Sequence, residues 1–333
     1  MNLTVPAPPS EAVSASGPPT VDVVIVNWNA GTQLTDCLQA LHKCDKSGFT
    51  LGQVIVIDNA STDGSADAAQ RLVLGVPLTM VRNALNSGFA AACNQGAQKS
   101  RADYLLFLNP DAVVFADSLS APIAFLEKQE SKQICIVGIP LIDDSGLPTR
   151  NSCRFPTPNL FFRELLGLHY LFPMRFPGHV QLEWPHDESR EVDHVIGAFY
   201  LVRRCVFDTL NGFDERFFVY KEDLDFSLRA AQAGWKSFYF AETRAYHRGG
   251  GSSEQIKAKR LFYGLRSRVQ YGFKHFGVFA AVGLLLATLF LEPAARIARA
   301  LLMRSTGALW ETLGGIGRLW VWAVARPFHA WTN

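Results

Sequence analysis

Apolar segments of strand length alternate with helical segments over the first third of this chain. Hydrophobic runs predict strands at residues 21–27, 53–58, 78–82 and 104–108, and helical patterns predict helices at 32–43 and 65–74. Strands that alternate with helices pair in a parallel sheet. Polar side chains follow several of these strands, and open α/β sheets bind ligands at the carboxyl ends of their strands. The sequence therefore predicts an α/β fold with a ligand site at that edge.

Charge is divided unevenly along the chain. The 333 residues have a net charge of +2, yet residues 255–333 contain eleven Lys or Arg and only two acids. Residues 1–254 therefore carry a net charge of −7, and we expect the two parts to face different partners. An acidic region suits a metal site, and a basic apolar tail suits a membrane surface. With 48% hydrophobic residues, the chain can form one large domain with an appendage.

The first 20 residues and the cysteines predict the compartment. Residues 1–20 are rich in Pro, Ala and Ser and carry one charge, which predicts a disordered leader rather than a secretory signal. The six cysteines are scattered, without the spacing of zinc ligands. Together these features predict a reducing, cytosolic setting with free thiols.

Two polar loops follow the early strands. The first, residues 58–65, begins with Asp58 and Asn59, whose side chains are placed to grip a base or a ribose. Residues 86–89 and 94–96 are expected to form a second polar loop and a helix start. The same residue types are favoured at N-caps and turns for backbone reasons alone, so a structural role is the alternative for both loops.

The strand at 104–108 runs into Asn109-Pro110-Asp111. Proline cannot donate a hydrogen bond to a neighbouring strand, so the strand breaks there and Asp111 can project into a cleft. A carboxylate at a strand end is a natural oxygen ligand for Mg²⁺ or Mn²⁺, which would bridge the phosphates of a nucleotide. Taken by itself, the motif also fits an Asx-Pro turn without a metal.

A predicted helix begins near residue 222. Leu224 and Leu228 fall on one side of it, which places Glu222 and Asp223 at its N-terminus. Acids in the first turn also stabilise a helix through its macrodipole, and this is the structural alternative.

His247 follows a predicted strand at 235–241 and precedes a glycine-rich loop that starts after Arg248. This position at the end of a strand favours a functional role for the imidazole. His186 and His194 have no comparable setting.

Beyond residue 263 the composition changes again. Residues 276–291 carry no charge but are shorter than the ~20 residues that a simple membrane span needs. A second apolar segment, residues 308–325, contains three tryptophans. Such segments are typical of helices that lie in a membrane interface or re-enter it, and core or dimer helices are the alternative. The basic cluster just before the tail could grip lipid phosphates or a lipid-linked pyrophosphate, or form a solvated helix face.

Six motifs occur in one order along the chain. They are Val-Ile-Val-Asn-Trp-Asn, Val-Ile-Asp-Asn-Ala-Ser-Thr-Asp-Gly-Ser, Asn-Ser-Gly-Phe-Ala, Leu-Asn-Pro-Asp, Gly-Phe-Asp-Glu-Arg-Phe-Phe and Glu-Asp-Leu-Asp. Over residues 21–276 the sequence resembles glycosyltransferase family 2, in particular its rhamnosyltransferase-like branch. The resemblance implies a GT-A-like α/β domain with a mixed, mostly parallel sheet at residues 21–263, followed by a helical membrane-associating tail at 264–333.

The resemblance also implies roles for individual residues. The implied general base is Asp223, with Glu222 beside it, and the implied ligands of a divalent cation are Asp111 and His247. Only the second acid of the family's Asp-x-Asp element is present here, because Asn109 stands in the first position. Donor-binding candidates are Asn27, Asn29, Asp58, Asn59, Asn86, Gly88, Asn94 and Asn109. Candidates for contact with the acceptor or phosphate are Arg248, Arg260, Arg266 and Arg268.

The implied activity is an inverting sugar transfer. The expected donor is the nucleotide-diphospho-sugar dTDP-L-rhamnose, and the expected acceptor is a lipid-linked or cell-surface polysaccharide precursor at the cytoplasmic face of the cell membrane. No nucleic-acid partner is expected, and a homodimer is compatible with the sequence.

Three alternatives remain open at this point. The same chemistry fits another UDP-, GDP- or dTDP-sugar, since motifs that grip diphosphate and ribose say little about the hexose. A non-catalytic nucleotide-binding scaffold of a membrane polysaccharide complex is a second alternative, against which the joint presence of Asp111, Asp223 and His247 argues. A nucleotidyltransferase would need a basic glycine-rich loop after the first strand, and residues 27–31 contain no Lys or Arg.

Overall fold

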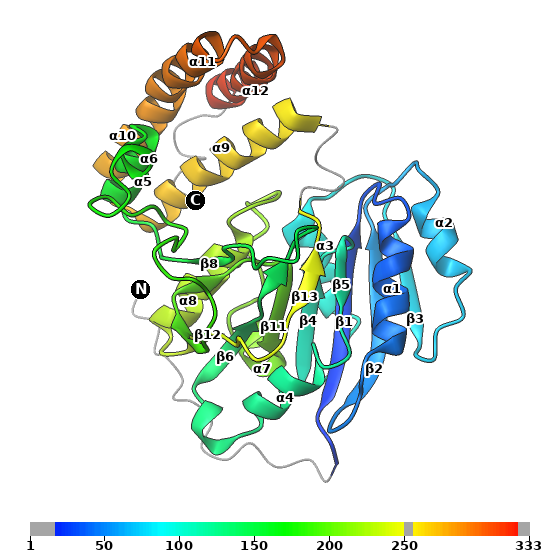
Figure 1. The fold of residues 1–333 in the computed structure, drawn as a ribbon. Coiled ribbons are helices and arrows are strands. Elements are labelled where there is room, and N and C mark those ends of the chain that lie inside the picture. The colour runs from blue at the N-terminus through cyan, green and yellow to red at the C-terminus, as the bar shows by residue number, and fades with distance from the viewer. Residues whose placement is uncertain (1–16, 250–255, 326–333) are drawn as a thin grey trace. The chain divides into compact units, whose positions relative to one another are not determined.

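The computed structural model describes residues 17–249 and 256–325, and its elements are labelled in Figure 1. Most of the predicted leader lies outside the described residues, and the first strand begins at Thr20. The chain divides into two units. The first comprises residues 1–153, 185–214 and 223–251, and the second comprises residues 154–184, 215–222 and 252–333.

An eight-stranded sheet forms the centre of the first unit, in the order β3-β2-β1-β4-β11-β6-β12-β9. β1 is parallel to β2 and β4, and β2 is parallel to β3; β11 runs antiparallel to β4 and β6, and β12 is parallel to β6 and antiparallel to β9. The sheet is mixed and mostly parallel, which confirms the predicted fold class. The strands are β1 (Thr20–Asn27), β2 (Thr50–Asp58), β3 (Leu78–Arg82), β4 (Tyr104–Leu108), β6 (Ile134–Gly138), β9 (Arg190–Val192), β11 (Phe199–Arg203) and β12 (Lys236–Tyr239).

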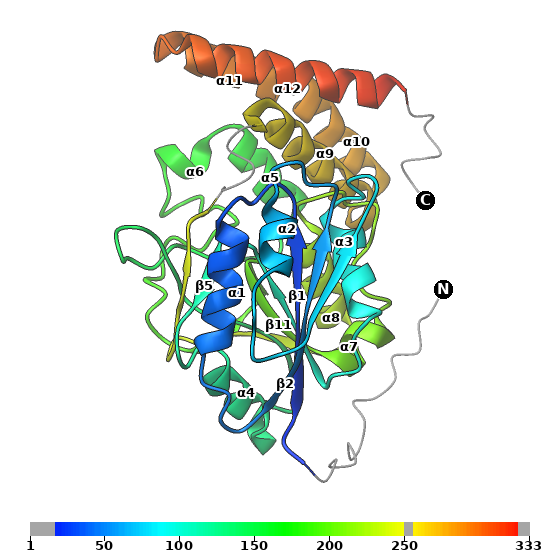
Figure 2. The ribbon, with the colours of Figure 1, turned by 90° about the vertical axis from the view of Figure 1, so that its right-hand side faces the viewer.

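Helices cover both faces of this sheet (Figure 2). Side chains alternate between the two faces along β1: Val23 and Ile25 belong to the same core cluster as Leu34 of α1, whereas Val24 meets α3 at Gly96. The helices on the face of α1 (Gln33–Lys43) include α2 (Ser65–Gln70), and those on the other face are α3 (Phe89–Ala97), α7 (Arg204–Thr209) and α8 (Glu222–Gln232). A further helix, α4 (Ser120–Leu126), and the 3₁₀ turn η1 (Gln129–Ser131) precede β6.

Phenylalanine side chains hold α7 and α8 against the sheet. The ring of Phe107 in β4 lies 5.0 Å from that of Phe207 and 4.9 Å from that of Phe213, measured between centroids. Phe226 of α8 lies 5.3 Å from Phe207. This packing fixes the position of α8, whose first turn carries the predicted base.

Gly96 allows α3 to lie close against β1. A Cβ at this position would lie 2.4 Å from Val24 Cγ1, which belongs to a stiff β-branched side chain in a buried strand. We therefore expect Gly96→Ala to lower the free energy of unfolding by about 1–3 kcal/mol through overpacking, measured by urea denaturation. Gly264→Ala is the matched control, because nothing lies within 4 Å of a Cβ at that helical position. Equal stability of the two variants would contradict this packing.

Two small sheets lie beside the main one within the first unit. One has the order β5-β13-β7 and the other pairs β10 with β8. They matter for the site because they carry two histidines, His247 in β13 and His194 in β10. Their strands are β5 (Ala112–Val114), β7 (Leu141–Ile142), β8 (Ser152–Cys153), β10 (His194–Val195) and β13 (Ala245–His247).

The second unit is helical. Its helices are α5 (Pro158–Leu165), α6 (Leu168–Leu171), α9 (Lys257–His275), α10 (Val278–Leu286), the π-helical turn η3 (Ala287–Leu291), α11 (Glu292–Leu302) and α12 (Thr306–Val324). The predicted domain boundary at residue 264 falls inside α9. Pro293 does not end the apolar segment, because it occupies the first turn of α11 directly after η3. Proline has no backbone N–H to donate, but it is tolerated in the first turn of a helix. The wider π-helical turn before it leaves room for the proline ring.

Candidate active site

The carboxyl ends of β1, β2 and β4 meet at one edge of the sheet. Asn27 is the register partner of Asp58, and Ile25 is that of Leu108, the last residue of β4. β11 runs in the opposite direction, and its first residue, Phe199, pairs with Leu108. The start of β11 therefore lies at the same edge, and the topology gathers the predicted polar residues there.

A buried polar network joins the ends of β1 and β2. Asn27 Nδ2 donates to Asp58 Oδ1 at 2.7 Å and to Ser65 Oγ at 2.9 Å, and Asn29 Oδ1 accepts from the backbone N–H of Thr62 at 2.8 Å. These bonds shape the loop, as the structural alternative expected. Asn27 Oδ1, however, is buried without a hydrogen-bond partner among the described residues. A buried acceptor of this kind normally has a partner, so it offers a contact to a donor group on a ligand.

The second polar loop is built around Asn59 and Gly88. Asn59 Nδ2 donates to the carbonyl of Gly88 at 3.0 Å, and Asn59 Oδ1 accepts from Asn83 Nδ2 at 2.9 Å. Asn86 Oδ1 accepts from the backbone N–H of Gly88 at 2.9 Å. Gly88 has a φ of 92°, which residues with a side chain rarely adopt. The loop therefore approaches the end of β2 with its backbone.

Asn94 has a different setting from the other donor-binding candidates. The sequence pattern placed a helix start at residues 94–96, but α3 begins at Phe89, so Asn94 lies within the helix. Its side chain accepts from the backbone N–H of Phe213 at 2.9 Å and donates to the carbonyl of Phe213 at 2.8 Å. Asn94 thus holds the chain that leads to α8, and we leave it out of the proposed donor contacts.

Asn109, Asp111 and His247 lie together. β5 and β13 pair antiparallel with His247 opposite Ala112, which brings the histidine beside the end of β4. His247 Nε2 lies 3.3 Å from Asp111 Oδ1 and 3.3 Å from Asn109 Nδ2. The side chains of Asp111 and His247 are 10% and 16% exposed. The fold thus brings these three side chains together from distant parts of the sequence.

The chemistry of this group fits one divalent cation shared with a substrate. Two ligands of an octahedral ion at about 2.1 Å lie about 3 Å apart when adjacent, close to the 3.3 Å between Asp111 Oδ1 and His247 Nε2. One carboxylate and one imidazole suit Mn²⁺ or Mg²⁺ only if other oxygens complete the coordination. Within residues 17–249 and 256–325, no group of three or more His, Cys, Asp or Glu side chains could hold a metal by itself. Phosphate oxygens of a nucleotide would be the natural complement.

Asp223, in the first turn of α8, is held from two sides. Gly197 N–H donates to Oδ2 at 2.8 Å, and Leu224 N–H donates to Oδ1 at 2.8 Å. Burial by itself would raise the pKa of Asp223, but the neighbouring His194 and these N–H groups lower the pKa to about 2. Asp223 is therefore ionised near neutral pH, the form that a general base needs, and loses that form only as the pH falls towards this pKa.

The start of β11 links Asp223 to the cation candidates. Gly197 holds the Asp223 carboxylate, and the carbonyl of the next residue, Ala198, accepts from the backbone N–H of Asn109 at 3.0 Å. A Cβ at Gly197 would lie only 3.0 Å from Asp223 Oδ2. The predicted base and the Asn109–Asp111 turn therefore flank the same short piece of backbone.

His194, which lies in β10, contacts Asp223 from the side of the protein interior. Its Nε2 lies 3.6 Å from Asp223 Oδ2, and its Nδ1 lies 3.0 Å from Ser227 Oγ. Ser227 Oγ lies 2.8 Å from the hydroxyl of Tyr200. His194, Ser227 and Tyr200 are all buried. No sequence signal marks His194, because β10 has only two residues and no periodic pattern.

The other acids at the start of α8 differ from Asp223. Asp225 Oδ2 accepts from Arg229 Nε at 2.8 Å, and the same guanidinium donates to the carbonyls of Leu210 and Gly212 at 2.6 and 2.7 Å. Asp225 therefore helps to tie α8 to the preceding loop. Glu222 is buried at the first position of α8.

Arg268 is engaged inside the second unit. It forms an ion pair with Glu292, which also pairs with Arg296 at 2.8 Å, and Arg268 Nη2 lies 3.2 Å from Thr288 Oγ1. Burial lowers the pKa of Arg268 to about 10, so it stays charged near neutral pH. Its position favours a role in joining α9 to α11 over contact with an acceptor.

The remaining predicted arginines are more accessible. Arg248 and Arg260 are exposed, and the guanidinium of Arg266 lies 5.8 Å from the ring centroid of Trp322. The two exposed residues keep the acceptor or phosphate role as a prediction.

Comparison with described families decides the class of protein. Residues 104–331 match the family described as Glycosyl transferase family group 2, and residues 22–183 match Glycosyl transferase family 2. The chain belongs to glycosyl transferase family group 2. It is therefore a glycosyltransferase, and the predicted family is confirmed.

Curated relatives refine this assignment. The N-acetylglucosaminyl-diphospho-decaprenol L-rhamnosyltransferase of Mycobacterium tuberculosis is 28% identical over 255 residues, which cover 72% of this chain and 79% of the relative. Rhamnosyltransferase WbbL of Escherichia coli is 29% identical over 172 residues, which cover 51% of this chain and 61% of that relative. The glycosyltransferase thus lies in the rhamnosyltransferase-like branch, as predicted.

Solved structures confirm the GT-A fold. Mannosyltransferase PcManGT from Pyrobaculum calidifontis, in complex with GDP-Man and Mn²⁺, matches with a TM-score of 0.51 at 19% identity and covers 95% of this chain and 84% of that one. S. aureus TarS in complex with UDP-GlcNAc matches with a TM-score of 0.53 at 15% identity and covers 90% of this chain and 80% of that one. At these identities the likeness concerns the fold alone.

Proposed function

We propose that this glycosyltransferase inverts the configuration of the transferred sugar and uses Asp223 as its general base. The observation that carries the proposal is the partly buried carboxylate of Asp223, held by two backbone N–H groups beside the backbone that contacts the Asn109–Asp111 turn. In a single displacement, the acceptor hydroxyl attacks the anomeric carbon opposite the leaving diphosphate. One carboxylate must then take the hydroxyl proton.

In this proposal, different residues at the sheet edge bind different parts of the two substrates. Asp223 accepts the proton of the acceptor hydroxyl, and Gly197 keeps its carboxylate in place. Asp111 and His247 would hold the cation and so fix the diphosphate end of the donor. A bound divalent cation supplies positive charge to the leaving phosphate oxygens. The loops of residues 58–65 and 86–88 line the nucleoside end, where Asn27 Oδ1 offers an acceptor.

We further propose dTDP-L-rhamnose as donor and a lipid-linked precursor as acceptor. The support comes from the two relatives, which are both named as rhamnosyltransferases, one of them for N-acetylglucosaminyl-diphospho-decaprenol. Residues that grip diphosphate and ribose do not select the hexose, so donor identity needs its own experiment.

A donor panel tests this proposal. Purified full-length protein is given dTDP-L-rhamnose, GDP-mannose, UDP-GlcNAc and UDP-glucose, each with and without Mn²⁺ and with a polyprenyl-diphosphate-sugar acceptor. We expect release of dTDP from dTDP-L-rhamnose, stimulated by Mn²⁺. Turnover of another donor would support the proposed transfer reaction but contradict rhamnose as the transferred sugar. Tight nucleotide binding without turnover of any donor would overturn the enzyme mechanism in favour of a scaffold.

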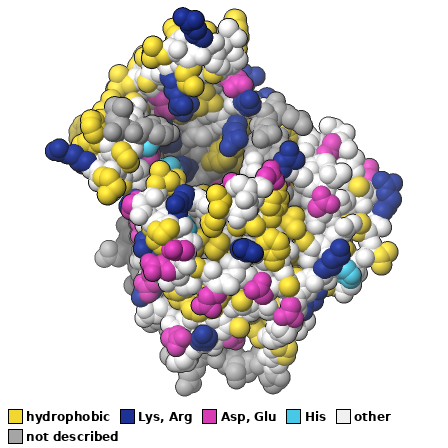
Figure 3. Space-filling view, viewed as in Figure 1, with side chains coloured by type: hydrophobic (Ala, Val, Ile, Leu, Met, Phe, Trp, Pro, Cys, Tyr) yellow, Lys and Arg dark blue, Asp and Glu magenta, His cyan; other side chains and the backbone are white. Residues whose placement is uncertain are grey.

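We also propose that the second unit associates with a membrane from the cytoplasmic side. Among the described residues, one continuous helix, Val278–Leu302, is long and apolar enough to cross a bilayer. Its most apolar 18-residue stretch has a mean hydropathy of 2.0, and 33% of that stretch is buried inside the protein. Large apolar side chains on its surface include Phe279, which is 91% exposed, and Leu302, which is 86% exposed. In the upper part of Figure 3, yellow apolar and dark blue basic side chains share the visible face of these helices. Such a surface suits an anionic membrane interface.

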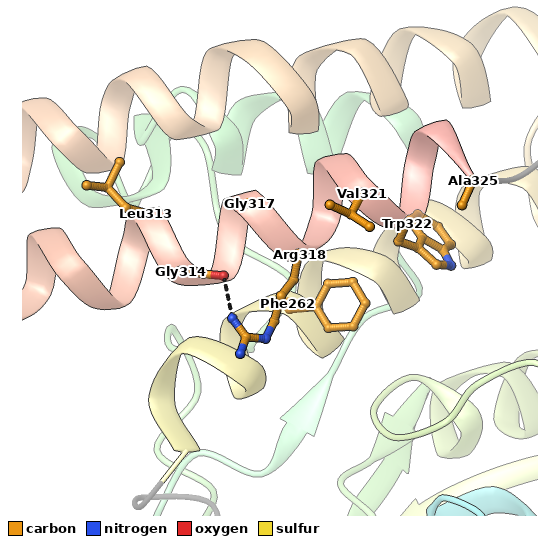
Figure 4. A pocket seen from close by; sticks show the side chains of 8 residues that line it. All are labelled: Phe262, Leu313, Gly314, Gly317, Arg318, Val321, Trp322 and Ala325. Carbon is orange, nitrogen blue, oxygen red and sulfur yellow. Dashed lines mark hydrogen bonds between the residues drawn. The ribbon is translucent and has the colours of Figure 1, made fainter.

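An apolar groove between α9 and α12 adds to this surface. It has a volume of about 570 Å³ and is lined mainly by apolar side chains, among them Phe262, Val321 and Trp322 (Figure 4). Arg318 lies at the groove, and its Nη1 donates to the carbonyl of Gly314 at 3.1 Å. A groove lined by apolar side chains and one guanidinium suits contact with a membrane interface better than contact with water alone.

Vesicle binding tests the membrane proposal. Burial of one large apolar side chain stabilises by about 1.5–3 kcal/mol, so we expect Phe279→Ser combined with Leu302→Ser to weaken binding to anionic phospholipid vesicles by at least ~10-fold. The measurement is co-sedimentation of full-length protein. Val73→Ser is the control, because Val73 is 95% exposed but belongs to the first unit. Equal binding of all three proteins would contradict the proposed surface.

A further inference from the structure

The side of Asp223 that faces the protein interior carries a second set of polar groups. His194 of β10 lies against the carboxylate, Ser227 of α8 lies against the other ring nitrogen, and Tyr200 of β11 lies against Ser227. These three residues come from three different elements and are 4%, 0% and 0% exposed. A buried polar set of this kind is costly unless every member has a partner, and here each does.

The carboxylate fixes one proton position in this set. Facing Asp223 Oδ2 at 3.6 Å, His194 Nε2 must carry a hydrogen, because a lone pair would be repelled by the negative charge. The other ring nitrogen, Nδ1, lies 3.0 Å from Ser227 Oγ, within hydrogen-bond distance. Ser227 Oγ lies 2.8 Å from the hydroxyl of Tyr200, and that hydroxyl also lies 3.4 Å from the backbone carbonyl of Asp223. The three side chains thus form one hydrogen-bonded chain behind the Asp223 carboxylate.

At 3.6 Å the contact of His194 with Asp223 is too long for a good hydrogen bond, so its effect is electrostatic. Electrostatic effects are strong at this place because the His194 ring is 5% exposed and the Asp223 side chain only 15% exposed. Burial is the largest influence on Asp223 and favours its protonated form, and His194 is the largest influence in the opposite direction. If His194 is removed, the N–H groups of Gly197 and Leu224 still lower the pKa of Asp223, but the largest influence against burial is lost, so that pKa rises.

We propose that His194, oriented by Ser227 and Tyr200, is the positioning residue that keeps the partly buried base Asp223 ionised and directed for catalysis. The inference rests on the proposed role of Asp223 as general base. His194 itself does not contact the substrate in this account. It acts through its Nε2–H on the carboxylate, and its ring is fixed from behind by Ser227.

Other charged and titratable groups around this set are accounted for. Arg229 of α8 is paired with Asp225, and it lowers the pKa of Tyr200 only in part, while burial raises that pKa well above its usual value. Tyr200 therefore keeps its proton throughout the working pH range and can donate to Ser227. Further titratable neighbours include Cys153, the register partner of His194, Cys135 of β6, and the acids next in sequence, Asp193 and Glu222.

Two substitutions of His194 separate its two nitrogens. The amide nitrogen of Gln can reach the position of Nε2, so His194→Gln keeps a donor near Asp223. The amide of Asn reaches only the position of Nδ1, so His194→Asn keeps a contact with Ser227 and loses the donor. We expect kcat to fall by roughly 10–100-fold in His194→Asn, with the KM for the donor unchanged, and to be largely retained in His194→Gln.

The pH profile of kcat/KM gives a readout that a merely structural role would not move. Because the pKa of Asp223 rises without His194, the acid limb of the profile should move to higher pH in His194→Asn and stay near its wild-type position in His194→Gln. His186→Asn is the matched control: His186 is also buried in the first unit, where its Nε2 accepts from the backbone N–H of Ser152 at 3.3 Å. It should lower stability without moving the acid limb.

Nucleotide affinity and the thermal unfolding temperature are measured for each variant, so that a loss of kcat through misfolding is recognised. Equal loss of kcat in the Asn and Gln variants, or an unmoved acid limb in His194→Asn, would overturn the role of His194. Failure of the general-base assignment would look different, because Asp223→Asn would then retain wild-type activity.

Discussion

Replacement of Asp223 by Asn is expected to lower kcat for sugar transfer by roughly 10²–10⁴-fold, the range for loss of a general base, with donor affinity unchanged. Asn has nearly the shape of Asp, so it can still accept the N–H of Gly197 at the same place. It cannot take a proton from the acceptor hydroxyl. The effect should therefore appear in kcat rather than in the KM for the donor.

The measurement is a steady-state assay of nucleotide release with acceptor present, together with calorimetric titration of the nucleotide. Asp208→Asn is a suitable control, since Asp208 is exposed on α7 and pairs with Arg204 four residues earlier. A reduction in nucleotide affinity without loss of kcat would assign Asp223 to donor binding and remove it from the chemistry.

Replacement of Asp111 by Asn is expected to abolish stimulation by Mn²⁺ and to lower kcat/KM by about 10²–10³-fold, the scale for loss of charge stabilisation at a leaving group. The remaining imidazole of His247 and the amide of Asn109 cannot replace a carboxylate oxygen as a ligand of a hard cation. Donor affinity should fall as well, because the diphosphate loses its anchor.

Binding of Mn²⁺ in the presence of the nucleoside diphosphate, followed by electron paramagnetic resonance, measures this effect without turnover. His247→Gln should weaken the ion less than Asp111→Asn, since it removes a neutral ligand and keeps the charge. Unchanged Mn²⁺ binding in both variants would contradict the assignment of the cation to this turn.

The fold was predictable because its signals are local and repeated. Continuous apolar runs predicted β3 and β4 with the bounds that the structure has, and the break at Pro110 set off β5 as expected. The place of Asp58 and Asp111 at one edge followed from the rule that ligands bind at strand ends, whereas Asp223, at a helix start, was named through the family resemblance.

The residues that hold the site in place could not be predicted from the sequence in the same way. His194 reaches Asp223 through a two-residue strand, which is too short to produce any periodic pattern. The predicted helix start at Asn94 was wrong because Asn and Gly are common at helix starts, whereas here α3 begins five residues earlier, at Phe89, directly after Gly88 with its φ of 92°. Contacts of this kind depend on tertiary packing, which the residue types by themselves do not specify.

The anomeric configuration of the product tests the proposed mechanism most directly. It can be read by nuclear magnetic resonance from the coupling of the anomeric proton and carbon in the glycosylated acceptor. A single base, Asp223, acting opposite the leaving diphosphate predicts a product whose configuration is opposite to that of the donor. Retention of the donor configuration would require a different reaction course and would contradict the role assigned to Asp223.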